Sequence, residues 1–262
     1  MTQRRRTTAT EYFGAELRRT REEAGMSRDE LGRLAGYVGG TIAALEIGER
    51  YPQQRFIAWL DEYFHTERFG LIYQRLLRRD AYPASFRPWI DIEAEATVLR
   101  TYELSVVPGL LQTEAYARAL LASVDHDVDG KVAARLARQE QVLGRSEPPM
   151  FVALIDETAL TIRVGDEKVM REQLERLAAL GERWIIQVVP HGAGSYRRLD
   201  GPFVIGTVDG SDQVYTPTQC GGYILDNPQT VAEVMWVWEA IRADALPRQQ
   251  SRELILKLAS TL

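Results

Sequence analysis

Residues 17–52 read LRRTREEAGMSRDELGRLAGYVGGTIAALEIGERYP, and the spacing of residues in this stretch predicts the fold of the first third of the chain. Ser27 is followed three positions later by a glutamate, which is the pattern of a capping box at the start of a helix. Gly36 ends that short helix, and a further helix follows with Ile42 and Leu45 facing inward. Two short helices joined by a tight turn that contains glycine are typical of a helix-turn-helix.

A flanking helix is predicted on each side of this pair, over about residues 12–24 and again after Pro52. Gly25 follows the first flanking helix, at the position where a residue with left-handed backbone commonly ends a helix. Apolar residues recur at helical spacing through all four helices and are expected to form one core. The inward positions are Phe13, Leu17, Ala24, Leu31, Leu34, Ile42, Leu45, Phe56, Leu60 and Phe64.

The same stretch resembles the xenobiotic-response-element (XRE) class of repressors. The matching features are Leu17, the Gly-Met-Ser turn at 25–27, Asp29-Glu30-Leu31, Ala35-Gly36, Ile42 with Leu45, Glu46, Gly48 and Pro52. The resemblance implies a DNA-binding domain over residues 1–80, with contacts to DNA from the starts of the second and third helices. It also implies a homodimer, because such modules read paired half-sites about one helical turn apart.

The starts of the second and third helices carry few side chains that read bases. In this sequence the contact positions of the XRE class hold Arg28, Gly39, Gly40 and Thr41. Arg28 suits a phosphate or the edge of a guanine, with which arginine pairs in a bidentate manner. Thr41 suits a phosphate or the methyl group of a thymine, and the backbone N–H groups of the two glycines suit a phosphate. We therefore expect DNA contacts at these four residues, with weak base readout.

The rest of the third helix is small or apolar, with Ala43 and Ala44 in its middle and Ile47 where many relatives have arginine. Binding then depends on phosphate contacts, which position a protein on DNA without reading its sequence. The arginines assigned to phosphates are Arg4, Arg5, Arg6, Arg18, Arg19, Arg28, Arg33 and Arg50. The alternative is a helix-turn-helix that is kept for folding or for binding a partner and does not bind DNA.

Charge and composition agree with a DNA-binding head on an acidic body. The 262 residues carry a net charge of −5 and are 45% hydrophobic, as in a globular protein with room for two domains. Residues 1–80 hold fourteen Lys/Arg and twelve Asp/Glu, so a weak positive balance falls on the expected DNA-binding part. One cysteine, Cys220, excludes an internal disulfide, three scattered histidines argue against a zinc site, and no apolar run is long enough to cross a membrane. We expect a cytoplasmic protein without metal or cofactor.

The remaining chain changes its hydrophobic period from helical to alternating near residue 150. Helices are predicted over about 89–105, 113–123, 131–144, 166–180, 229–245 and 249–262. Strands are predicted over 150–160, 162–164, 184–190, 203–208, 213–219 and 222–225, between turns rich in Gly and Asp. Helices followed by closely spaced strands indicate an α+β domain over residues 84–262, with a mostly antiparallel sheet, beside the mainly α-helical N-terminal domain.

A second resemblance covers nearly the whole chain. The segments that carry it are, in order, FGAELRR (13–19), AYPASFRPWIDIEAEATVLRTYE (81–103), VPGLLQTEAYARALL (107–121), RLARQE (135–140), MREQLERL (170–177) and GPF (201–203). This order is similar to that of actinobacterial WhiJ-like regulators, in which an XRE head is fused to a conserved C-terminal domain. The resemblance implies an antitoxin-like transcriptional regulator, with a small partner protein encoded nearby.

Polar and aromatic residues around these segments predict a pocket for a small-molecule effector or for the partner protein. The candidate residues are Trp89, Glu93, Gln112, Tyr116, Arg135 and Gln139. Arg135 and Gln139 lie one turn apart on a helix, as do Trp89 and Glu93, so each pair shares a face. A ligand would stack on Trp89 and pair with Arg135. The alternative is a salt bridge between Glu93 and Arg135 that ties two helices together, with Trp89 in the core.

Two other functions remain open. His191 follows one predicted strand, and Asp156 and Glu157 end another, so a histidine and a carboxylate are available as general acid and base. No nucleophile elbow, phosphate loop, metal spacing or dinucleotide fingerprint accompanies them, so an enzyme or carrier of a small molecule is the second hypothesis. The third is an interaction module, because the helix over 231–241 is apolar on most sides. Exposure of Trp236 would favour an interface over burial in the core.

Overall fold

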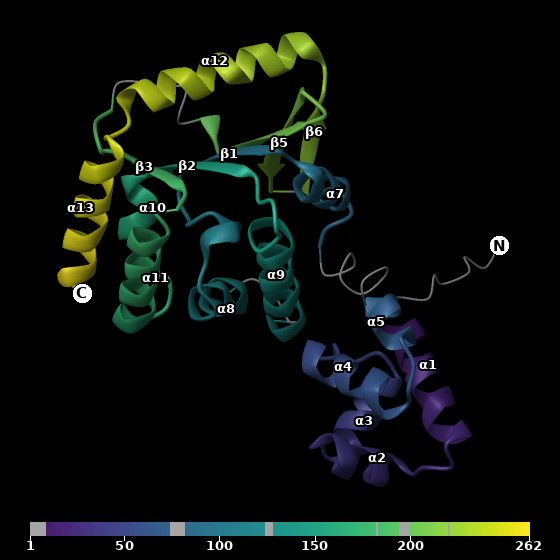
Figure 1. Ribbon diagram of the computed structural model, residues 1–262. Coiled ribbons are helices and arrows are strands. Elements are labelled where there is room, and N and C mark those ends of the chain that lie inside the picture. Colours follow the sequence, from purple (N-terminus) through teal and green to yellow (C-terminus); the bar gives the residue numbers. More distant parts are fainter. Residues whose placement is uncertain (1–8, 74–81, 124–127, 182, 194–199, 220) are drawn as a thin grey trace. The chain divides into compact units, whose positions relative to one another are not determined.

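The structure is a computed structural model that describes residues 9–73, 82–123, 128–181, 183–193, 200–219 and 221–262. Arg4, Arg5, Arg6 and Cys220 lie outside the described residues. The chain divides into two compact units, Met1–Tyr82 with Asp125–Ala134 and Pro83–Val124 with Arg135–Leu262. Figure 1 shows the helices of the first unit and the sheet of the second.

Between residues 9 and 73 the first unit consists of helices whose ends lie where the sequence predicts caps. They are α1 (Ala9–Glu23), α2 (Arg28–Ala35), α3 (Gly39–Glu46), α4 (Gln54–Tyr63) and α5 (Arg68–Ile72). Ser27 Oγ accepts a hydrogen bond from Glu30 N at 3.2 Å, and Ser27 N donates to Glu30 Oε2 at 2.7 Å. Gly25 and Gly36 have left-handed φ values of 67° and 76°. The capping box and the glycine-ended helices are therefore confirmed.

One hydrophobic core joins these helices. It buries most of the expected inward residues, namely Phe13, Leu17, Leu31, Ile42, Leu45, Phe56 and Leu60, together with Phe69 of α5. Two expectations are wrong. Leu34, near the end of α2, is 42% exposed, although Leu31 three positions earlier is fully buried. Ala24 is exposed because α1 ends one residue earlier, at Glu23.

The second unit contains a six-stranded sheet in the order β3-β2-β1-β4-β5-β6. The strands are β1 (Val98–Glu103), β2 (Met150–Asp156), β3 (Ile185–Val189), β4 (Phe203–Val208), β5 (Ser211–Thr218) and β6 (Gly221–Leu225). β1 pairs with β2, and β2 with β3, in parallel, whereas the β1–β4, β4–β5 and β5–β6 pairs are antiparallel. The unit is α+β, and its sheet is mixed, which corrects the expectation of a mostly antiparallel one.

The connections between strands explain the mixed sheet. Parallel neighbours need a crossover of about a dozen or more residues, and helices between β1 and β2 and between β2 and β3 supply it. By contrast, β4 and β5 are joined by a tight turn at Asp209 and Gly210, whose φ values are 50° and 77°. Two consecutive residues with positive φ form the turn that best joins twisted antiparallel strands.

The helix predicted over 89–105 is two elements in the structure. The chain leaves the first of them, α7 (Arg87–Glu95), at Ala96 and enters β1. Leu99 and Tyr102 are fully buried, but they belong to the cores on opposite faces of the sheet. A short apolar segment suits a helix or a buried strand equally well. Here the pairing of β1 with both β2 and β4 selects the strand.

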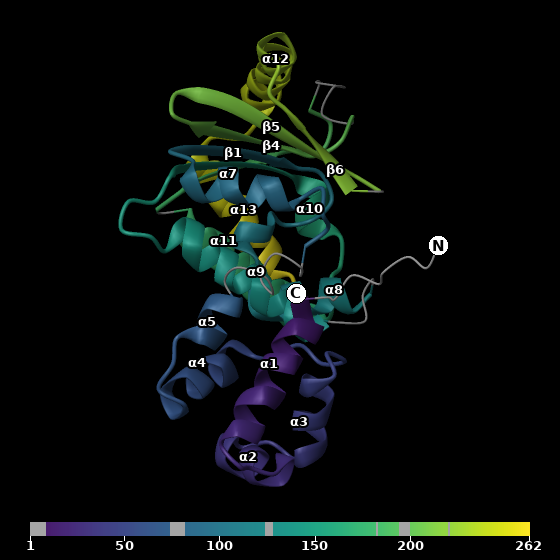
Figure 2. The same cartoon turned by 90° about the vertical axis from the view of Figure 1, so that its right-hand side faces the viewer.

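Helices cover both faces of the sheet (Figures 1 and 2). Besides α7 they are the short 3-10 turn η2 (Gly109–Leu111), α8 (Glu114–Ala122), α9 (Val128–Leu143), α10 (Glu157–Thr161), α11 (Glu167–Leu180), α12 (Pro228–Asp244) and α13 (Arg248–Ser260). α12 lies across one face, and α8, α11, α13 and the part of α9 from Arg135 onward lie on the other. α10 follows β2 directly, and residues 162–164 after it are not a strand, so that prediction is wrong.

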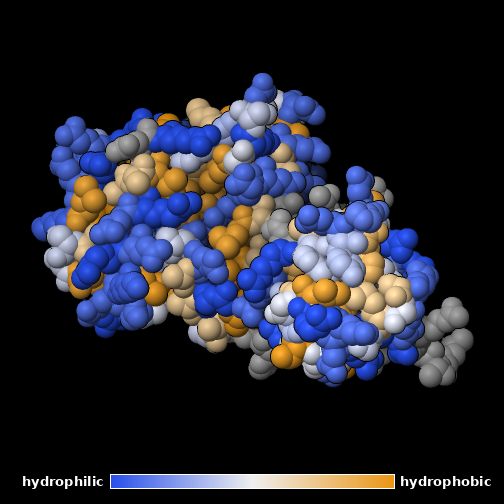
Figure 3. Space-filling model, turned by 60° about the horizontal axis from the view of Figure 1, so that its bottom comes forward, coloured by the Kyte–Doolittle hydropathy of each residue, from blue (hydrophilic) through white to orange (hydrophobic). Residues whose placement is uncertain are grey.

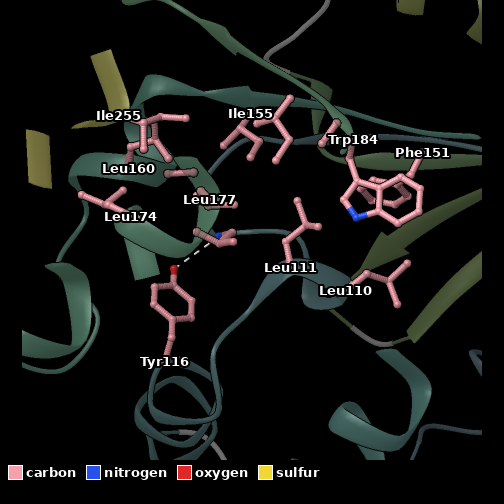
Figure 4. Packing of buried hydrophobic residues seen from close by; sticks show 14 of the residues in the cluster. Leu110, Leu111, Tyr116, Phe151, Ile155, Leu160, Leu174, Leu177, Trp184 and Ile255 are labelled. Atoms are coloured by element: carbon pink, nitrogen blue, oxygen red, sulfur yellow. Dashed lines mark hydrogen bonds between the residues drawn. The ribbon is translucent and has the colours of Figure 1, made fainter. Parts of the chain in front are cut away.

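Two hydrophobic cores lie on the two faces, because successive side chains of a strand point to opposite sides. Phe151 and Ile155 of β2 enter the core on the side of α11 and α13, and Leu154 enters the core beneath α12. Figure 4 shows the first of these cores, with Leu177 of α11 among its members. The largest side chain that α12 buries in the second core is Trp238.

Candidate functional site

Glu46, at the end of α3, connects three helices of the helix-turn-helix unit. Its side chain is completely buried. Oε1 accepts a hydrogen bond from Arg21 Nε of α1 at 2.5 Å, and Oε2 accepts one from Arg28 Nε of α2 at 2.8 Å. The Arg28 side chain is still 44% exposed, whereas that of Arg21 is 9% exposed. Arg28 is thus held at Nε, while part of its guanidinium remains at the surface beside the start of α2.

The start of α3 is closed at Gly39 and open at Gly40. A Cβ on Gly39 would lie 1.9 Å from Asp29 Oδ1, so a larger residue does not fit against this carboxylate. Apart from its chain neighbours and the backbone of α3, no described residue has an atom within 4 Å of the place where Gly40 would carry a Cβ, and Thr41 is half-buried. The negative charge of Asp29 opposes a phosphate at the Gly39 N–H. A phosphate at this helix start is therefore expected to contact Gly40 and Thr41.

Large apolar residues are exposed at both ends of α3 and at the end of α2. Val38 is 72% exposed, Ile47 56% and Leu34 42%. Figure 3 shows hydrophobic residues among the polar ones on the surface of this unit. Apolar side chains make no hydrogen bonds to base edges, so base readout by this surface depends on Thr41 and on Arg28.

Glutamates pair with three of the arginines assigned to phosphates: Glu46 pairs with Arg28, and glutamates of α1 pair with Arg18 and Arg19. Arg18 Nε lies 2.8 Å from Glu22 Oε1, and Arg19 pairs with two glutamates of the same helix. Arg33 and Arg50 are exposed and take part in no ion pair within the part of the chain that the structure describes. Arg50 is therefore better placed than Arg18 for the phosphate contact expected of both.

The described helices of this unit carry a negative balance of charge. Between residues 9 and 73 there are eight arginines, no lysine, and eleven aspartates and glutamates. The weak positive balance of residues 1–80 therefore comes from arginines outside the described residues. Phosphate binding by the described helices has to be local, at Arg28, Arg33 and Arg50, rather than through a broad basic surface.

A cavity of about 230 Å³ lies within the second unit, on the face of the sheet that α7 and the later part of α9 cover. Five aromatic residues are among those that line it, namely Phe86, Trp89, Phe151, Phe203 and Tyr215. Trp89 stacks on Tyr215 with ring centroids 5.7 Å apart, and Phe86 packs edge-to-face on the same ring at 5.0 Å. An apolar cavity of about 150 Å³ takes up benzene, so this one has room for an aromatic ring with a short polar arm.

Four charged side chains line the cavity: Glu93, Glu103, Arg135 and Arg138. Arg138 Nε lies 3.0 Å from Glu93 Oε2, and both side chains are buried. Burial raises the pKa of Glu93 and Arg138 opposes that rise; at this distance we expect the pair to be ionised. Arg135 Nη1 donates a hydrogen bond to Gln112 Oε1 at 2.7 Å. Glu93 thus pairs with Arg138, one turn further along α9, and not with Arg135 as the alternative prediction had it.

Gln112, Tyr116 and Gln139 hold the segment after β1 in place at the cavity. Gln112 Nε2 donates to Val107 O at 2.7 Å, and Gln139 Nε2 donates to Gly109 O at 2.8 Å. The hydroxyl of Tyr116 accepts a hydrogen bond from Val107 N at 3.3 Å (Figure 4). Gln112 also lines the cavity, whereas Tyr116 and Gln139 contact the segment after β1 but do not line the cavity. The structure brings the six predicted pocket residues together, four of them at the wall.

Among the residues at the cavity that the sequence prediction lacks, four have polar or charged side chains: Thr101, Glu103, Arg138 and Tyr215. Residues two positions apart share a face in a strand but not in a helix. Because the sequence predicts β1 as part of a helix, Thr101 and Glu103 are not expected to face the cavity together. Tyr215 faces the cavity because β5 is in the sheet beside β4. Arg138 has a signal in the sequence, since it lies three positions after Arg135 on one helix.

Glu103, the last residue of β1, has a carboxyl group that titrates near neutral pH. Burial raises its pKa from 4.5 to about 7, although Arg138 and Arg135 both lower it. Its side chain forms no hydrogen bond with a described residue. Such a carboxyl carries a proton part of the time at neutral pH, and it accepts or donates a hydrogen bond accordingly. Glu103 is therefore a group whose charge a ligand in the cavity can change.

Replacing Glu103 with glutamine (E103Q) is expected to make the second unit less sensitive to pH. The folded-state pKa of about 7 lies above the ordinary 4.5, so the stability linked to this group is complete below pH 4.5 and is lost as the pH rises through 7. E103Q removes that loss, so between pH 5 and pH 8 its free energy of unfolding should rise by about 2–3 kcal/mol relative to that of the unsubstituted protein. Urea denaturation at both pH values measures the difference. Glu114→Gln, an exposed glutamate of α8, is the control, and an equal pH dependence in E103Q and the unsubstituted protein would contradict the prediction.

The alternative catalytic residues lie at the carboxyl ends of β2 and β3. Asp156 is 1% exposed, and its Oδ1 caps α10 by accepting a hydrogen bond from Thr158 N at 3.0 Å. Glu157 Oε2 accepts a hydrogen bond from the backbone N of His191 at 2.8 Å. The His191 side chain is exposed and makes no hydrogen bond to a described residue, and none of the three candidate residues lines the cavity. Both carboxylates thus contact backbone groups and help to hold the ends of these strands.

α12 buries only part of its surface. Val231, Trp238 and Ile241 are buried, whereas Trp236 is 79% exposed. Of the two alternatives for Trp236, the structure therefore excludes burial in the core of the second unit.

No three His, Cys, Asp or Glu side chains of the described residues are grouped to hold a metal ion. Among the described helices, none has both the length and the apolar character of a membrane-spanning segment.

Two family models match the chain. A helix-turn-helix domain matches residues 13–68, and a domain of unknown function, DUF5753, matches residues 86–257. The second match includes every residue that lines the cavity. Neither a curated protein nor a solved structure matches the chain significantly. The helix-turn-helix match supports DNA binding, and the match over the second unit names no activity.

Proposed function

This chain belongs to the family of the domain of unknown function DUF5753 and carries a helix-turn-helix domain, and we propose that it is a DNA-binding transcriptional regulator. Its first unit binds DNA mainly through phosphates, and its second unit senses a small molecule in the cavity beside Glu103. The XRE class, the WhiJ-like and antitoxin-like character, the homodimer and a small partner protein are part of the proposal. These finer points rest on the resemblance of the sequence.

The arrangement of α2 and α3 is the observation that carries the DNA-binding part of the proposal. Glu46 holds Arg28 beside the start of α2 with its side chain 44% exposed. Gly40 and Thr41 leave the start of α3 accessible. Arginine guanidinium groups and backbone N–H groups at a helix start both suit phosphates. Because the other exposed residues of α3 are small or apolar, we expect affinity to depend strongly on salt and weakly on DNA sequence.

Replacing Arg28 with alanine (R28A) is expected to weaken DNA binding about fivefold to tenfold, since a phosphate contact from arginine contributes roughly 1 kcal/mol. The slope of log affinity against log salt concentration should decrease by about one, because one phosphate contact is lost. The measurement is fluorescence anisotropy of the full chain with a duplex from upstream of its own gene, beside a scrambled duplex, at several salt concentrations.

Arg163→Ala is the matched control for R28A. Arg163 is an exposed arginine of the second unit that pairs with a glutamate four positions away, and its removal should leave the affinity and the slope unchanged. R28A also breaks a contact with Glu46, so hydrogen exchange of α1 and α3 is followed to show that the unit stays folded. A folded R28A with unchanged affinity would exclude a role for Arg28. If the unsubstituted protein bound neither duplex, the regulator proposal would be wrong.

One observation favours a second candidate function. The described helices of the first unit have more acidic than basic residues, and the exposed ends of α3 are apolar. A chain with this surface that does not bind DNA would be a family member recruited to bind or transform a small molecule in the cavity. The same titration separates the two functions, because the second predicts ligand binding without affinity for DNA.

A further inference from the structure

The size and walls of the cavity restrict its ligand to a small molecule with an apolar body. Its volume is about 230 Å³, which is below the usual range of about 300–1,000 Å³ for sites of drug-sized ligands. Phe86, Trp89 and Tyr215 pack against one another at one part of the wall. These rings offer faces and edges on which a ligand ring stacks.

The polar groups at the wall indicate the charge of the ligand. Glu93 and Arg138 form a pair at 3.0 Å and together add no net charge. Arg135 keeps its proton at any physiological pH, whereas Glu103 can gain or lose one. The charges of the described side chains that line the cavity add up to zero when Glu103 is ionised and to one positive charge when it is protonated.

Three classes of ligand give different buried charges. A cation beside the two arginines and two glutamates would leave one positive charge buried, which is costly in a poorly solvated site. A neutral ligand uses neither charge at the wall. An anion leaves the filled cavity neutral if Glu103 takes up a proton, and that proton gives the anion a hydrogen-bond donor besides Arg135.

We propose that the cavity binds a small monocarboxylic acid with an aromatic or apolar body, whose carboxylate pairs with Arg135 and accepts a hydrogen bond from the protonated Glu103 carboxyl. The inference deepens the proposed sensing function and rests on it for its biological meaning. Glu103 gains the proton from solvent, and no covalent bond is made or broken.

The groups around Glu103 make proton uptake accessible near neutral pH. They are Arg135 and Arg138 of α9, Tyr116 of α8, Glu93 of α7 and Tyr215 of β5. Burial raises the pKa of Glu103 to about 7 in spite of the two arginines. A ligand carboxylate beside it would raise this pKa further, since a like charge disfavours ionisation. Binding of the acid is therefore coupled to uptake of one proton, and affinity should fall as the pH rises above 7.

Benzoate tests the proposal, with benzylamine and benzyl alcohol as probes of the same ring but with positive and zero charge. Isothermal titration calorimetry of the full chain at pH 6 and pH 8 measures each affinity. We expect benzoate to bind tighter than the other two probes and about tenfold more weakly at pH 8 than at pH 6. In buffers of different ionisation enthalpy, the unsubstituted protein should take up about half a proton at pH 7 and nearly one at pH 8.

Two variants test whether Glu103 causes the pH dependence of benzoate binding and whether Arg135 binds the carboxylate. E103Q should bind benzoate with nearly the same affinity at both pH values, and Arg135→Met should weaken benzoate at least tenfold while leaving benzyl alcohol unchanged. Glu114→Gln, exposed on α8, is the control and should keep the pH dependence. Tighter binding of benzylamine, benzoate affinity independent of pH in the unsubstituted protein, or no binding of benzoate at millimolar concentration would each overturn the proposal. If a variant fails to fold, the number of protons that the unsubstituted protein takes up on binding benzoate still tests the proposal, and no uptake at pH 8 would overturn it.

The DNA titration separates this inference from the proposed function. If benzoate binds with proton uptake but does not change DNA affinity, the ligand class stands and the sensing function is wrong. If DNA binding is intact and benzoate does not bind, the regulator stands and the ligand class is wrong.

Discussion

Glu46→Gln (E46Q) is expected to lower the free energy of unfolding of the helix-turn-helix unit by about 3 kcal/mol. The substitution keeps the shape of the side chain and removes the charge that holds Arg21 and Arg28. The Arg21 side chain is 9% exposed, so its guanidinium would remain buried with the half-exposed Glu22, 3.4 Å from its Nη2, as its remaining carboxylate partner. A buried charge that loses its partner typically costs about 3–5 kcal/mol. Arg21 keeps its hydrogen bond to Met26 O, and we therefore expect the lower end of that range.

Hydrogen exchange of the backbone amides of α1 and α3 measures this loss within the first unit. The most protected amides should exchange about 100-fold faster in E46Q, which corresponds to about 3 kcal/mol. Glu23→Gln is the matched control, because Glu23 is 59% exposed and pairs with Arg19 on the surface of α1. An exposed pair of this kind contributes at most about 1 kcal/mol. Similar protection in E46Q and the unsubstituted protein would show that Glu46 does not hold these helices together.

Trp238→Ala (W238A) is expected to lower the free energy of unfolding of the second unit by about 4 kcal/mol. Trp238 is completely buried between α12 and the sheet, where its ring packs edge-to-face on Phe203 with centroids 6.4 Å apart. Alanine would leave a cavity that the neighbouring Val231 and Ile241 fill only in part. Urea denaturation followed by circular dichroism measures the loss, since that signal does not depend on the removed indole.

α12 provides its own control for W238A. Trp236 lies two positions earlier on the same helix and is 79% exposed, so W236A should change the free energy of unfolding by no more than about 0.5 kcal/mol. Trp238→Phe should cost less than W238A, because Nε1 of Trp238 makes no hydrogen bond with the described residues and phenylalanine removes that buried donor. Equal losses of unfolding free energy in W236A and W238A would contradict the burial of Trp238, and not of Trp236, against the sheet.

The helix-turn-helix is predictable from sequence because its signals are local. The Ser27–Glu30 capping box spans one turn, and Gly25 and Gly36 end helices by their own left-handed backbone. The strand over 203–208 is likewise predicted at its observed bounds, since β-branched and aromatic residues there are followed directly by a two-residue turn. Such features depend on a few neighbouring residues, so no distant partner is needed to recognise them.

The arrangement of the sheet depends on partners far apart in the chain. Val98–Glu103 fits a helix or a strand by its own pattern, and it is a strand because β2 and β4 pair with it on both sides. The mixed topology has the same origin, since the crossover helices allow β1, β2 and β3 to lie parallel. Strand pairing depends on the whole unit, so it cannot be predicted from the sequence of the short segment alone.

The candidate pocket residues are recognisable in the sequence, but their charges and partners are not. Residue type and helical spacing suffice to nominate Trp89, Glu93 and Arg135. Which arginine pairs with Glu93 depends on how α7 and α9 pack, and the structure selects Arg138. The pKa of Glu103 is raised because folding removes water from its carboxyl group, and the two arginines beside it offset only part of this rise. Desolvation acts through space on groups that distant segments bring together, so only the folded chain decides which side chain titrates near neutral pH.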